Sequence, residues 1–224
     1  MQRVDSPAVK TARRLSWRLI TAISVFISVV VLFWWITDEI VLENEGAFDS
    51  NVFAAINEIT DPATTKLMLL FTFFGSTKFL LPAYIILGLL FLFYRRKTFH
   101  SISVATVGLS SIGLLYLLKN IFRRHRPPEP LTSNVIGYSY PSGHSFSSFT
   151  FCGLLIYIIW KSNLSRIWKW IISVVLFFFA FMVAFSRVYL HVHYASDVAA
   201  GFLLSVIWLS ICYYLFSIVR PSKI

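Results

Sequence analysis

Long apolar runs separated by short polar stretches dominate the chain from residue 17 to the C-terminal end. A membrane-spanning helix needs about 20 mainly apolar residues, and these runs do not alternate like half-buried strands, so they predict membrane-spanning helices. Six spans are expected, over residues 17–36, 78–94, 99–119, 145–160, 167–186 and 197–219. The second and fourth runs are short, so they either continue into neighbouring polar residues or tilt into the protein interior.

One further apolar segment, over residues 66–76, is too short to cross a membrane alone. It is predicted to be an interfacial or re-entrant piece that leads through Gly75 into the second span. We therefore expect one all-α integral membrane domain over residues 1–224, with a cytoplasmic N-terminal segment over 1–16 and an outer loop over 37–77. The first span is expected to be an uncleaved anchor, because Thr-Asp-Glu follows it instead of a small-residue cleavage site.

Composition supports this class of protein. Of the 224 residues, 57% are hydrophobic and only 13% are charged, and the mean hydropathy is +0.72. So few charged side chains cannot cover the surface of a soluble domain of this length, which excludes an ordinary soluble globular protein. Cys152 and Cys212 lie inside apolar runs and are expected to be buried free thiols.

The charged residues indicate how the spans are oriented. The formal net charge is +10, but most Lys and Arg lie between apolar runs, so they are interpreted as topology determinants and not as a nucleic-acid surface. Four basic clusters fall on one side of a six-span protein, predicted to be cytoplasmic: Arg3, Lys10, Arg13, Arg14 and Arg18; Arg95, Arg96 and Lys97; Lys161, Arg166 and Lys169; Arg220 and Lys223. Seven of the ten acids lie in the first outer loop: Asp38, Glu39, Glu43, Glu45, Asp49, Glu58 and Asp61.

One basic loop breaks this pattern. The segment after the third span carries Lys119, Arg123, Arg124 and Arg126, yet the predicted topology places it on the outer side. Basic residues normally favour the cytoplasmic side, so a basic outer loop indicates that its charges serve another purpose.

Three polar clusters lie at the outer ends of the third to sixth predicted spans. They cover residues 119–127 (KNIFRRHRP), 140–145 (YPSGHS) and 186–197 (SRVYLHVHYASD). Ionisable residues at membrane depth are costly and need partners or a function. Each cluster alone also fits a structural role, as surface charges, a helix-capping turn or a structural His–Asp pair. All three together, in this order and on one side, favour an active site at the outer membrane-surface end of spans three to six.

Each of the three clusters supplies a part of a phosphoryl-transfer site. Lys119, Arg126 and Arg187 offer fixed positive charges to the equatorial oxygens of a phosphoryl group in flight. Pro-Ser-Gly-His over residues 141–144 lies at the start of the fourth span. Gly143 lets the backbone approach an anion closely, and the free N–H groups of the helix N-terminus can bind that anion. His144 is then placed beside the phosphate as a proton donor.

The third cluster offers a nucleophile. His193 and Asp197 are four residues apart, so they share a face of a helical turn. The carboxylate can hold one ring nitrogen and leave the other free to attack, which is a triad arrangement with histidine itself as nucleophile. His191 is a second candidate by position, but it has no acid one turn away.

These motifs resemble the signature of the type 2 phosphatidic-acid phosphatase superfamily of membrane lipid phosphatases. That signature is K-x6-R-P, P-S-G-H and S-R-x5-H-x3-D, and the chain matches it without departure at 119–127, 141–144 and 186–197. The resemblance implies that His193 is the nucleophile, His144 the general acid and base, and Asp197 the residue that orients His193. It implies phosphate binding by Lys119, Arg126, Ser142, Gly143 and Arg187.

The reaction implied is metal-independent and cofactor-free removal of phosphate from a membrane lipid through a phosphohistidine. The substrate is expected to enter sideways from the outer leaflet of a bacterial plasma membrane. Undecaprenyl diphosphate is placed slightly ahead of phosphatidylglycerol phosphate, with phosphatidate also plausible. The alternatives are a phosphotransferase or sugar-phosphate phosphatase of the same superfamily, and a non-enzymatic transporter or scaffold. A transporter is disfavoured because the sequence shows no inverted repeat. A scaffold is disfavoured because all three motifs are intact. No oligomeric state is predicted.

Overall fold

The computed structural model describes residues 7–42, 46–133 and 135–219, and within these ranges the chain is helical and has no strand. The helices are α1 (Pro7–Trp35), η1 (Ile36–Leu42), α2 (Ala47–Glu58), α3 (Pro62–Phe74), α4 (Thr77–Leu89), η2 (Leu90–Tyr94), α5 (Thr98–Phe122), α6 (Gly143–Trp160), α7 (Arg166–Tyr189) and α8 (Ala195–Val219). The π-helices η1 and η2 continue α1 and α4 without a break. The predicted all-α class is confirmed.

Six helical segments in the described ranges are long and apolar enough to cross a membrane, as the sequence predicts. They are Leu19–Glu39, Thr77–Tyr94, Thr98–Phe122, Gly143–Trp160, Arg166–Tyr189 and Ala195–Val219. The third span ends at Phe122 instead of 119 and the fifth at Tyr189 instead of 186, because polar residues there stay helical. Several motif residues therefore belong to the helices themselves and not to the loops after them.

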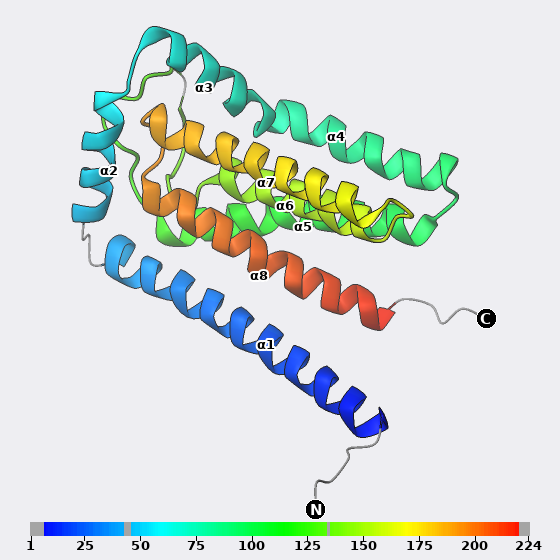
Figure 1. Ribbon diagram of the computed structural model, residues 1–224. Coiled ribbons are helices and arrows are strands. Elements are labelled where there is room, and N and C mark those ends of the chain that lie inside the picture. The colour runs from blue at the N-terminus through cyan, green and yellow to red at the C-terminus, as the bar shows by residue number, and fades with distance from the viewer. Residues whose placement is uncertain (1–6, 43–45, 134, 220–224) are drawn as a thin grey trace, which may run out of the picture.

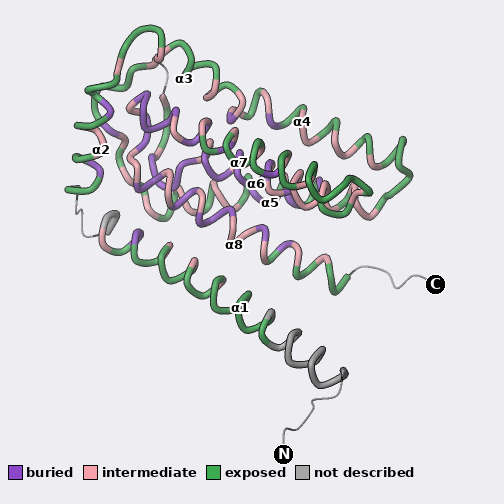
Figure 2. The backbone as a smooth tube through the Cα atoms, in the orientation of Figure 1, coloured by how far each residue is buried: buried purple, intermediate pink, exposed green. Residues whose placement is uncertain are grey.

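α6 lies in the middle of the bundle, where it packs along α7 and α8 (Figure 1). At one end of the bundle, which we call the site end, α5 and α7 finish and α6 and α8 begin, and α2 lies beside this end. Figure 2 shows that buried residues are concentrated towards the site end of α6, α7 and α8. The charged motifs thus lie in a well-packed part of the molecule.

The short apolar segment forms α3, which packs against α7. The rings of Phe71 and Phe74 lie 6.2 and 5.2 Å from the ring of Phe179, measured between centroids. Asp61 caps α3, because its carboxylate accepts hydrogen bonds from two N–H groups of the first turn. α3 then leads through Gly75 into α4, as predicted, and its depth in a membrane stays a prediction.

Two glycines permit close backbone approach at the site end. A Cβ added to Gly75 would lie 2.5 Å from Val183 and 2.9 Å from the ring of His144. A Cβ added to Gly201 would lie 2.8 Å from the carbonyl oxygen of Ser142. The α3–α4 turn and α8 therefore both approach the start of α6 more closely than a larger residue allows.

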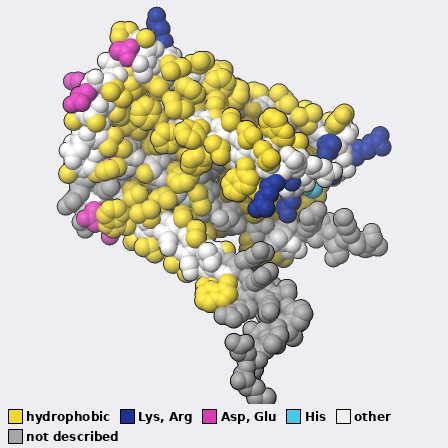
Figure 3. Space-filling view, viewed as in Figure 1, with side chains coloured by type: hydrophobic (Ala, Val, Ile, Leu, Met, Phe, Trp, Pro, Cys, Tyr) yellow, Lys and Arg dark blue, Asp and Glu magenta, His cyan; other side chains and the backbone are white. Residues whose placement is uncertain are grey.

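Charge is separated along the molecule. On the face seen in Figure 3, hydrophobic side chains cover the middle, most acidic side chains lie near α2 and α3, and most basic ones lie at the opposite end. Among the charges used to predict orientation, the following lie outside the described residues: Arg3, Glu43, Glu45, Arg220 and Lys223, together with the side chains of Lys10, Arg13, Arg14 and Arg18. Cys152 and Cys212 are buried and free, as predicted.

Candidate active site

The eight predicted site residues all lie at the site end. They come from four helix ends and two loops: Lys119 (last turn of α5), Arg126 (α5–α6 loop), Ser142, Gly143 and His144 (start of α6), Arg187 (last turn of α7), His193 (α7–α8 loop) and Asp197 (first turn of α8). The sequence predicts that these four helix ends converge on one pocket, and the structure brings them together. The side of the membrane on which they lie stays a prediction.

His193 is buried between a carboxylate and a guanidinium. Its Nδ1 lies 3.3 Å from Oδ2 of Asp197, and its Nε2 lies 3.2 Å from Nη1 of Arg126. Ser139 was not predicted as a site residue, yet its hydroxyl lies 3.2 Å from Nδ1 of His193 and donates to Oδ2 of Asp197. The N–H of Tyr194 also donates to Oδ2, at 3.0 Å. The carboxylate thus holds Nδ1, and Nε2 faces the cations.

Burial lowers the pKa of His193 to about 3, although the hydrogen bond and charge of Asp197 favour the protonated form. The charges of Arg187 and Arg126 lower it further. The ring is therefore neutral at physiological pH. With the Nδ1 hydrogen directed at Asp197, Nε2 carries the lone pair, so His193 has the form that a nucleophile requires.

The three predicted phosphate-binding cations are held by neutral oxygens. Lys119 Nζ donates to the carbonyl oxygens of Tyr138 and Ser139 at 2.6 and 3.2 Å. Arg126 Nη1 donates to the carbonyl oxygen of Val192 at 2.7 Å, and burial lowers the pKa of this guanidinium.

Arg187, only 7% exposed, donates through Nη1 to the hydroxyl of Thr72 in α3. Among the described residues, none of Lys119, Arg126 and Arg187 forms an ion pair with a carboxylate. Arg187 is buried and Lys119 and Arg126 are half-buried. Cations withdrawn from water without counter-ions are costly, so this cluster is suited to an anionic ligand.

Unpartnered polar atoms lie at the same place. The hydroxyl of Ser142 and the Nε of Arg187 are buried without a hydrogen-bond partner among the described residues. Ser142 precedes the first turn of α6, where helix N–H groups are free to bind an anion. A Cβ on Gly143 would lie 3.0 Å from Leu115 and 3.9 Å from Lys119, so this glycine keeps the start of α6 beside that cation. The N–H of Ser142 donates to the carbonyl oxygen of Asp197 and the N–H of His193 to that of Arg187, so the two unpartnered atoms belong to residues next to the His193–Asp197 pair.

The other histidines occupy different surroundings. His191 is partly buried, its ring lies 4.9 Å from the ring of Phe53 between centroids, and burial lowers its pKa. His191 thus packs against an aromatic ring of α2. His125 is exposed in the α5–α6 loop. Among the described residues, no three His, Cys, Asp or Glu side chains are grouped so that they could hold a metal ion, and metal independence stays a prediction.

Asp197 has a second partner that the sequence did not reveal. Arg124, noted only as part of a basic loop, donates through Nη1 to Oδ1 of Asp197 at 2.7 Å. Its Nη2 donates to Oδ2 of Asp49, in α2, at 2.8 Å. The basic loop offered a signal for Arg124, but nothing in the sequence connects Asp49 with the motifs, because the two partners are 75 residues apart.

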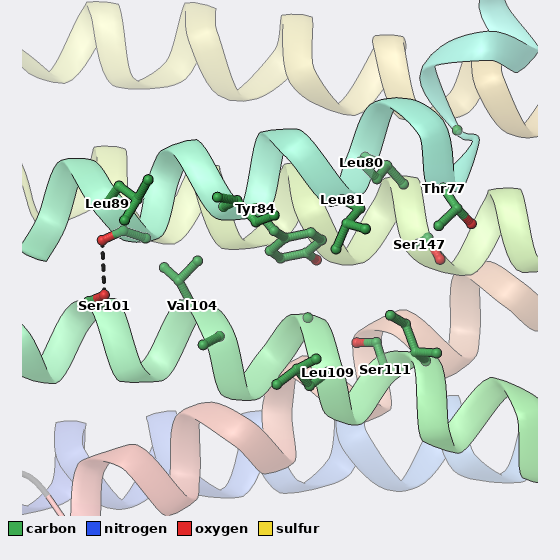
Figure 4. A pocket seen from close by; sticks show the side chains of 16 residues that line it. Thr77, Leu80, Leu81, Tyr84, Leu89, Ser101, Val104, Leu109, Ser111 and Ser147 are labelled. Carbon is green, nitrogen blue, oxygen red and sulfur yellow. Dashed lines mark hydrogen bonds between the residues drawn. The ribbon is translucent and has the colours of Figure 1, made fainter.

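An apolar groove of about 320 Å³ opens between α4 and α5 (Figure 4). At one end it is lined by Gly75 and Ser147, close to His144, since a Cβ on Gly75 would meet that ring. At the other end the hydroxyl of Ser101 donates to the carbonyl oxygen of Gly88 at 2.9 Å. Leucine, valine and tyrosine side chains line the walls between these ends. The groove thus runs from the site end, past the hydrophobic middle of the molecule, towards the α4–α5 connection.

Sequence comparisons place the chain among known phosphatases. Residues 100–220 match the PAP2 superfamily. The chain is 31% identical over 161 residues to phosphatidylglycerophosphatase B of Bacillus subtilis, a match covering 71% of this chain and 78% of that protein. It is 32% identical over 140 residues to dolichyldiphosphatase 1 of Homo sapiens, where the match covers 57% of this chain and 59% of that protein.

Solved structures show the same architecture. The crystal structure described as the first transmembrane PAP2-type phosphatidylglycerolphosphate phosphatase from Bacillus subtilis has a TM-score of 0.79 and 26% identity to this chain. The match covers 88% of this chain and 98% of the Bacillus subtilis chain. The crystal structure of Aquifex aeolicus LpxE has a TM-score of 0.58 and 25% identity to this chain, and the match covers 76% of this chain and 97% of LpxE.

Proposed function

The chain belongs to the PAP2 superfamily and is a membrane-embedded lipid phosphatase, and we propose that it works through a phosphohistidine formed on His193. The observation that carries this proposal is the charge arrangement around that ring. Lys119, Arg126 and Arg187 have no carboxylate partner among the described residues, while the imidazole beside them is neutral. A phosphate group supplies the negative charge that balances this set.

In the first step, Nε2 of His193 attacks phosphorus, and the bond from phosphorus to the leaving oxygen breaks. His144, at the start of α6, donates a proton to that oxygen. Attack places positive charge on the imidazole, which Asp197 stabilises by accepting a hydrogen bond from Nδ1–H. Lys119 and the two arginines bind the equatorial oxygens, whose negative charge they offset in the transition state.

In the second step, water attacks phosphorus and the phosphorus–nitrogen bond breaks, which returns the electron pair to Nε2. His144 takes the proton of this water and so returns to its starting state. Inorganic phosphate then leaves the cation cluster. The same residue serves as acid in one step and base in the next, and this chain's side chains perform both steps.

Substrate binding also frees the nucleophile. Before binding, Nη1 of Arg126 lies 3.2 Å from Nε2 of His193 and can donate to its lone pair. Phosphate oxygens bind a guanidinium more strongly than a neutral ring nitrogen does. The arriving phosphate therefore draws Arg126 into its own hydrogen bonds, and the lone pair of His193 becomes available for attack.

The apolar groove supports a lipid substrate. Its volume of about 320 Å³ falls in the range of ligand pockets, roughly 300–1,000 Å³, and it ends beside His144. A chain lying there can place its phosphate in the cation cluster. The names of the relatives move phosphatidylglycerol phosphate ahead of undecaprenyl diphosphate as the substrate to test first, while the dolichyldiphosphatase match keeps polyprenyl diphosphates as candidates.

A panel assay tests the substrate class. The purified protein is given phosphatidylglycerol phosphate, undecaprenyl diphosphate, phosphatidate and a sugar phosphate, and both inorganic phosphate and phosphorylated acceptors are measured. We expect inorganic phosphate from at least one lipid and none from the sugar phosphate. A phosphorylated acceptor without inorganic phosphate identifies a phosphotransferase, and turnover of the sugar phosphate alone contradicts the lipid proposal.

Acid-quenched labelling with radioactive substrate tests the two histidines. His193→Ala is expected to abolish both turnover and covalent labelling. His144→Ala is expected to lose roughly 10²–10⁴-fold in rate, the usual contribution of general acid–base catalysis, while still forming some labelled enzyme with a diphosphate, which is a good leaving group. Label on His144, on His191 or on no residue contradicts the assignment.

A further inference from the structure

Arg124 lies between two buried carboxylates. Its Nη1 is 2.7 Å from Oδ1 of Asp197, and its Nη2 is 2.8 Å from Oδ2 of Asp49. The side chain of Arg124 is 11% exposed, that of Asp49 is 2% exposed and that of Asp197 is fully buried. One guanidinium thus joins a carboxylate of α2 to the carboxylate that contacts the nucleophile.

The position of this guanidinium is fixed from several directions. Its Nη1 also donates to the hydroxyl of Ser196 at 2.8 Å, and it lies over the ring of Tyr194, 4.1 Å from the centroid. Asp49 accepts from the N–H of Ser196 at 2.9 Å and from its hydroxyl at 2.6 Å. Asp49 therefore holds Arg124 and the first turn of α8 together, and that turn carries Asp197.

The two oxygens of Asp197 have separate partners. Oδ1 accepts from Arg124, while Oδ2 is directed at Nδ1 of His193 and accepts from Ser139 and the N–H of Tyr194. With Oδ1 held by Arg124, rotation of the carboxylate is restricted. Oδ2 therefore stays directed at the imidazole.

Arg124 differs from the phosphate-binding cations in its charge balance. Two carboxylates flank it, and together they raise its pKa although burial opposes the charge. Lys119, Arg126 and Arg187 pair with no described carboxylate. A guanidinium already paired with two buried carboxylates gains little from a phosphate oxygen, so Arg124 is suited to a different task.

We propose that Arg124 and Asp49 are positioning residues, which act through Asp197 on the nucleophile His193. Arg124 fixes the rotation of the Asp197 carboxylate, and Asp49 fixes Arg124 from α2. The proposal rests on the proposed function, because it requires attack by His193. Its chemical basis is that a carboxylate held in place stabilises positive charge on the ring without first having to reorient.

Steady-state kinetics on the preferred lipid test this arrangement. Arg124→Gln is expected to lower kcat by about 10- to 100-fold and Asp49→Asn by about 10-fold, since each removes a hydrogen bond to a charged group. KM is expected to stay unchanged, because neither residue touches the substrate. Arg124→Lys keeps the charge and is expected to recover part of the loss. Arg123→Gln and Glu58→Gln remove exposed neighbouring charges of the same sign and are expected to leave kcat unchanged.

A double-mutant cycle separates positioning from other roles. In an Asp197→Asn background, Arg124→Gln is expected to cause little further loss, because its effect passes through Asp197. A raised KM for Arg124→Gln, or a full additional loss in the Asp197→Asn background, overturns the proposal. Thermal unfolding in detergent checks folding, and if Arg124→Gln fails to fold, Asp49→Asn and Arg124→Lys carry the same test.

The assay also separates this inference from the function on which it rests. A wild-type protein that releases no phosphate from any lipid in the panel contradicts the proposed function, and the positioning role falls with it. An active wild-type protein whose kcat is unchanged by Arg124→Gln and by Asp49→Asn contradicts the positioning role alone.

Discussion

Protonation of His193 is controlled by opposing neighbours. Burial and two arginines disfavour the charged ring, while Asp197 favours it, and burial prevails, with a pKa of about 3. A neutral, oriented imidazole is thus present before substrate arrives. In the proposed mechanism, Asp197 stabilises positive charge only once attack creates it, so its contribution is expected in the transition state more than in the resting enzyme.

This pKa has a consequence for stability. The folded pKa of His193, about 3, lies below the ordinary value of about 6.5, so the unfolded chain binds the extra proton first as pH falls. The contribution of this residue to stability is complete above about pH 6.5 and is lost between about pH 6.5 and 3. We expect the melting temperature in detergent to fall over this range and to fall less steeply in His193→Gln. Equal slopes in the two proteins would contradict this.

The eight motif residues and their meeting at one end of the bundle could be predicted because fixed spacings along the chain identify them, while their roles stay predictions. Ser139, Thr72 and Asp49 could not, because their roles depend on tertiary contacts with Asp197, Arg187 and Arg124. A buried acid on a short helix looks, in sequence, like any other charge of an acidic loop. Only packing of α2 against the start of α8 gives it a partner.

Helices were more predictable than their ends and their packing. All six spans were expected from hydropathy, but α6 and α8 begin at Gly143 and Ala195, before the expected 145 and 197. In the first turn of α8, Ser196 and Asp197 form hydrogen bonds with Asp49, Arg124 and Ser139, so this helix begins earlier than hydropathy alone indicates. The packing of α3 against α7 was not predicted, since an apolar segment of this length fits several positions.

The turn from α3 to α4 depends on a glycine. In Gly75→Ala, the new methyl group would meet Val183 at 2.5 Å and His144 at 2.9 Å, so α3 must move away from α6 and α7. We expect a loss of stability of about 1–3 kcal/mol, typical of overpacking, together with reduced activity through His144. Gly113→Ala is the matched control, because nothing lies within 4 Å of its Cβ in α5. That variant is expected to be as stable as wild type or more so, and similar losses in both would exclude a steric cause.

The groove between α4 and α5 is predicted to hold the lipid chain of the substrate. Leu81 lines it and Ile86, also exposed on α4, does not. Leu81→Trp is expected to raise KM for a long-chain lipid by about 10-fold, the cost of losing a few buried methylenes, and to leave turnover of a short-chain analogue unchanged. Ile86→Trp adds the same bulk outside the groove and is expected to behave like wild type. Equal effects on both substrates would contradict chain binding in the groove.

At the scale of the whole molecule, charge separation and site position support one orientation. Asp49, Glu58 and Asp61 belong to the segments at the site end, whereas the α4–α5 and α6–α7 connections at the other end carry basic clusters. Loops rich in Lys and Arg tend to lie on the cytoplasmic side of a membrane. The site end, which is opposite these loops, is therefore proposed to face the extracytoplasmic side. The basic α5–α6 loop is no exception to this logic, because Arg124 and Arg126 are directed into the site.

Cysteine labelling tests this orientation. In a background without Cys152 and Cys212, Glu58→Cys and Arg96→Cys each place one thiol at an exposed position, at the site end and at the opposite end. A membrane-impermeant maleimide applied to intact cells is expected to label the Glu58→Cys protein, and to label the Arg96→Cys protein only after permeabilisation. Retained lipid phosphatase activity shows that each variant is folded. Labelling of the Arg96→Cys protein alone would reverse the orientation, and the substrate would then have to reach the site from the inner leaflet. Labelling of both proteins from outside would exclude the six-span topology.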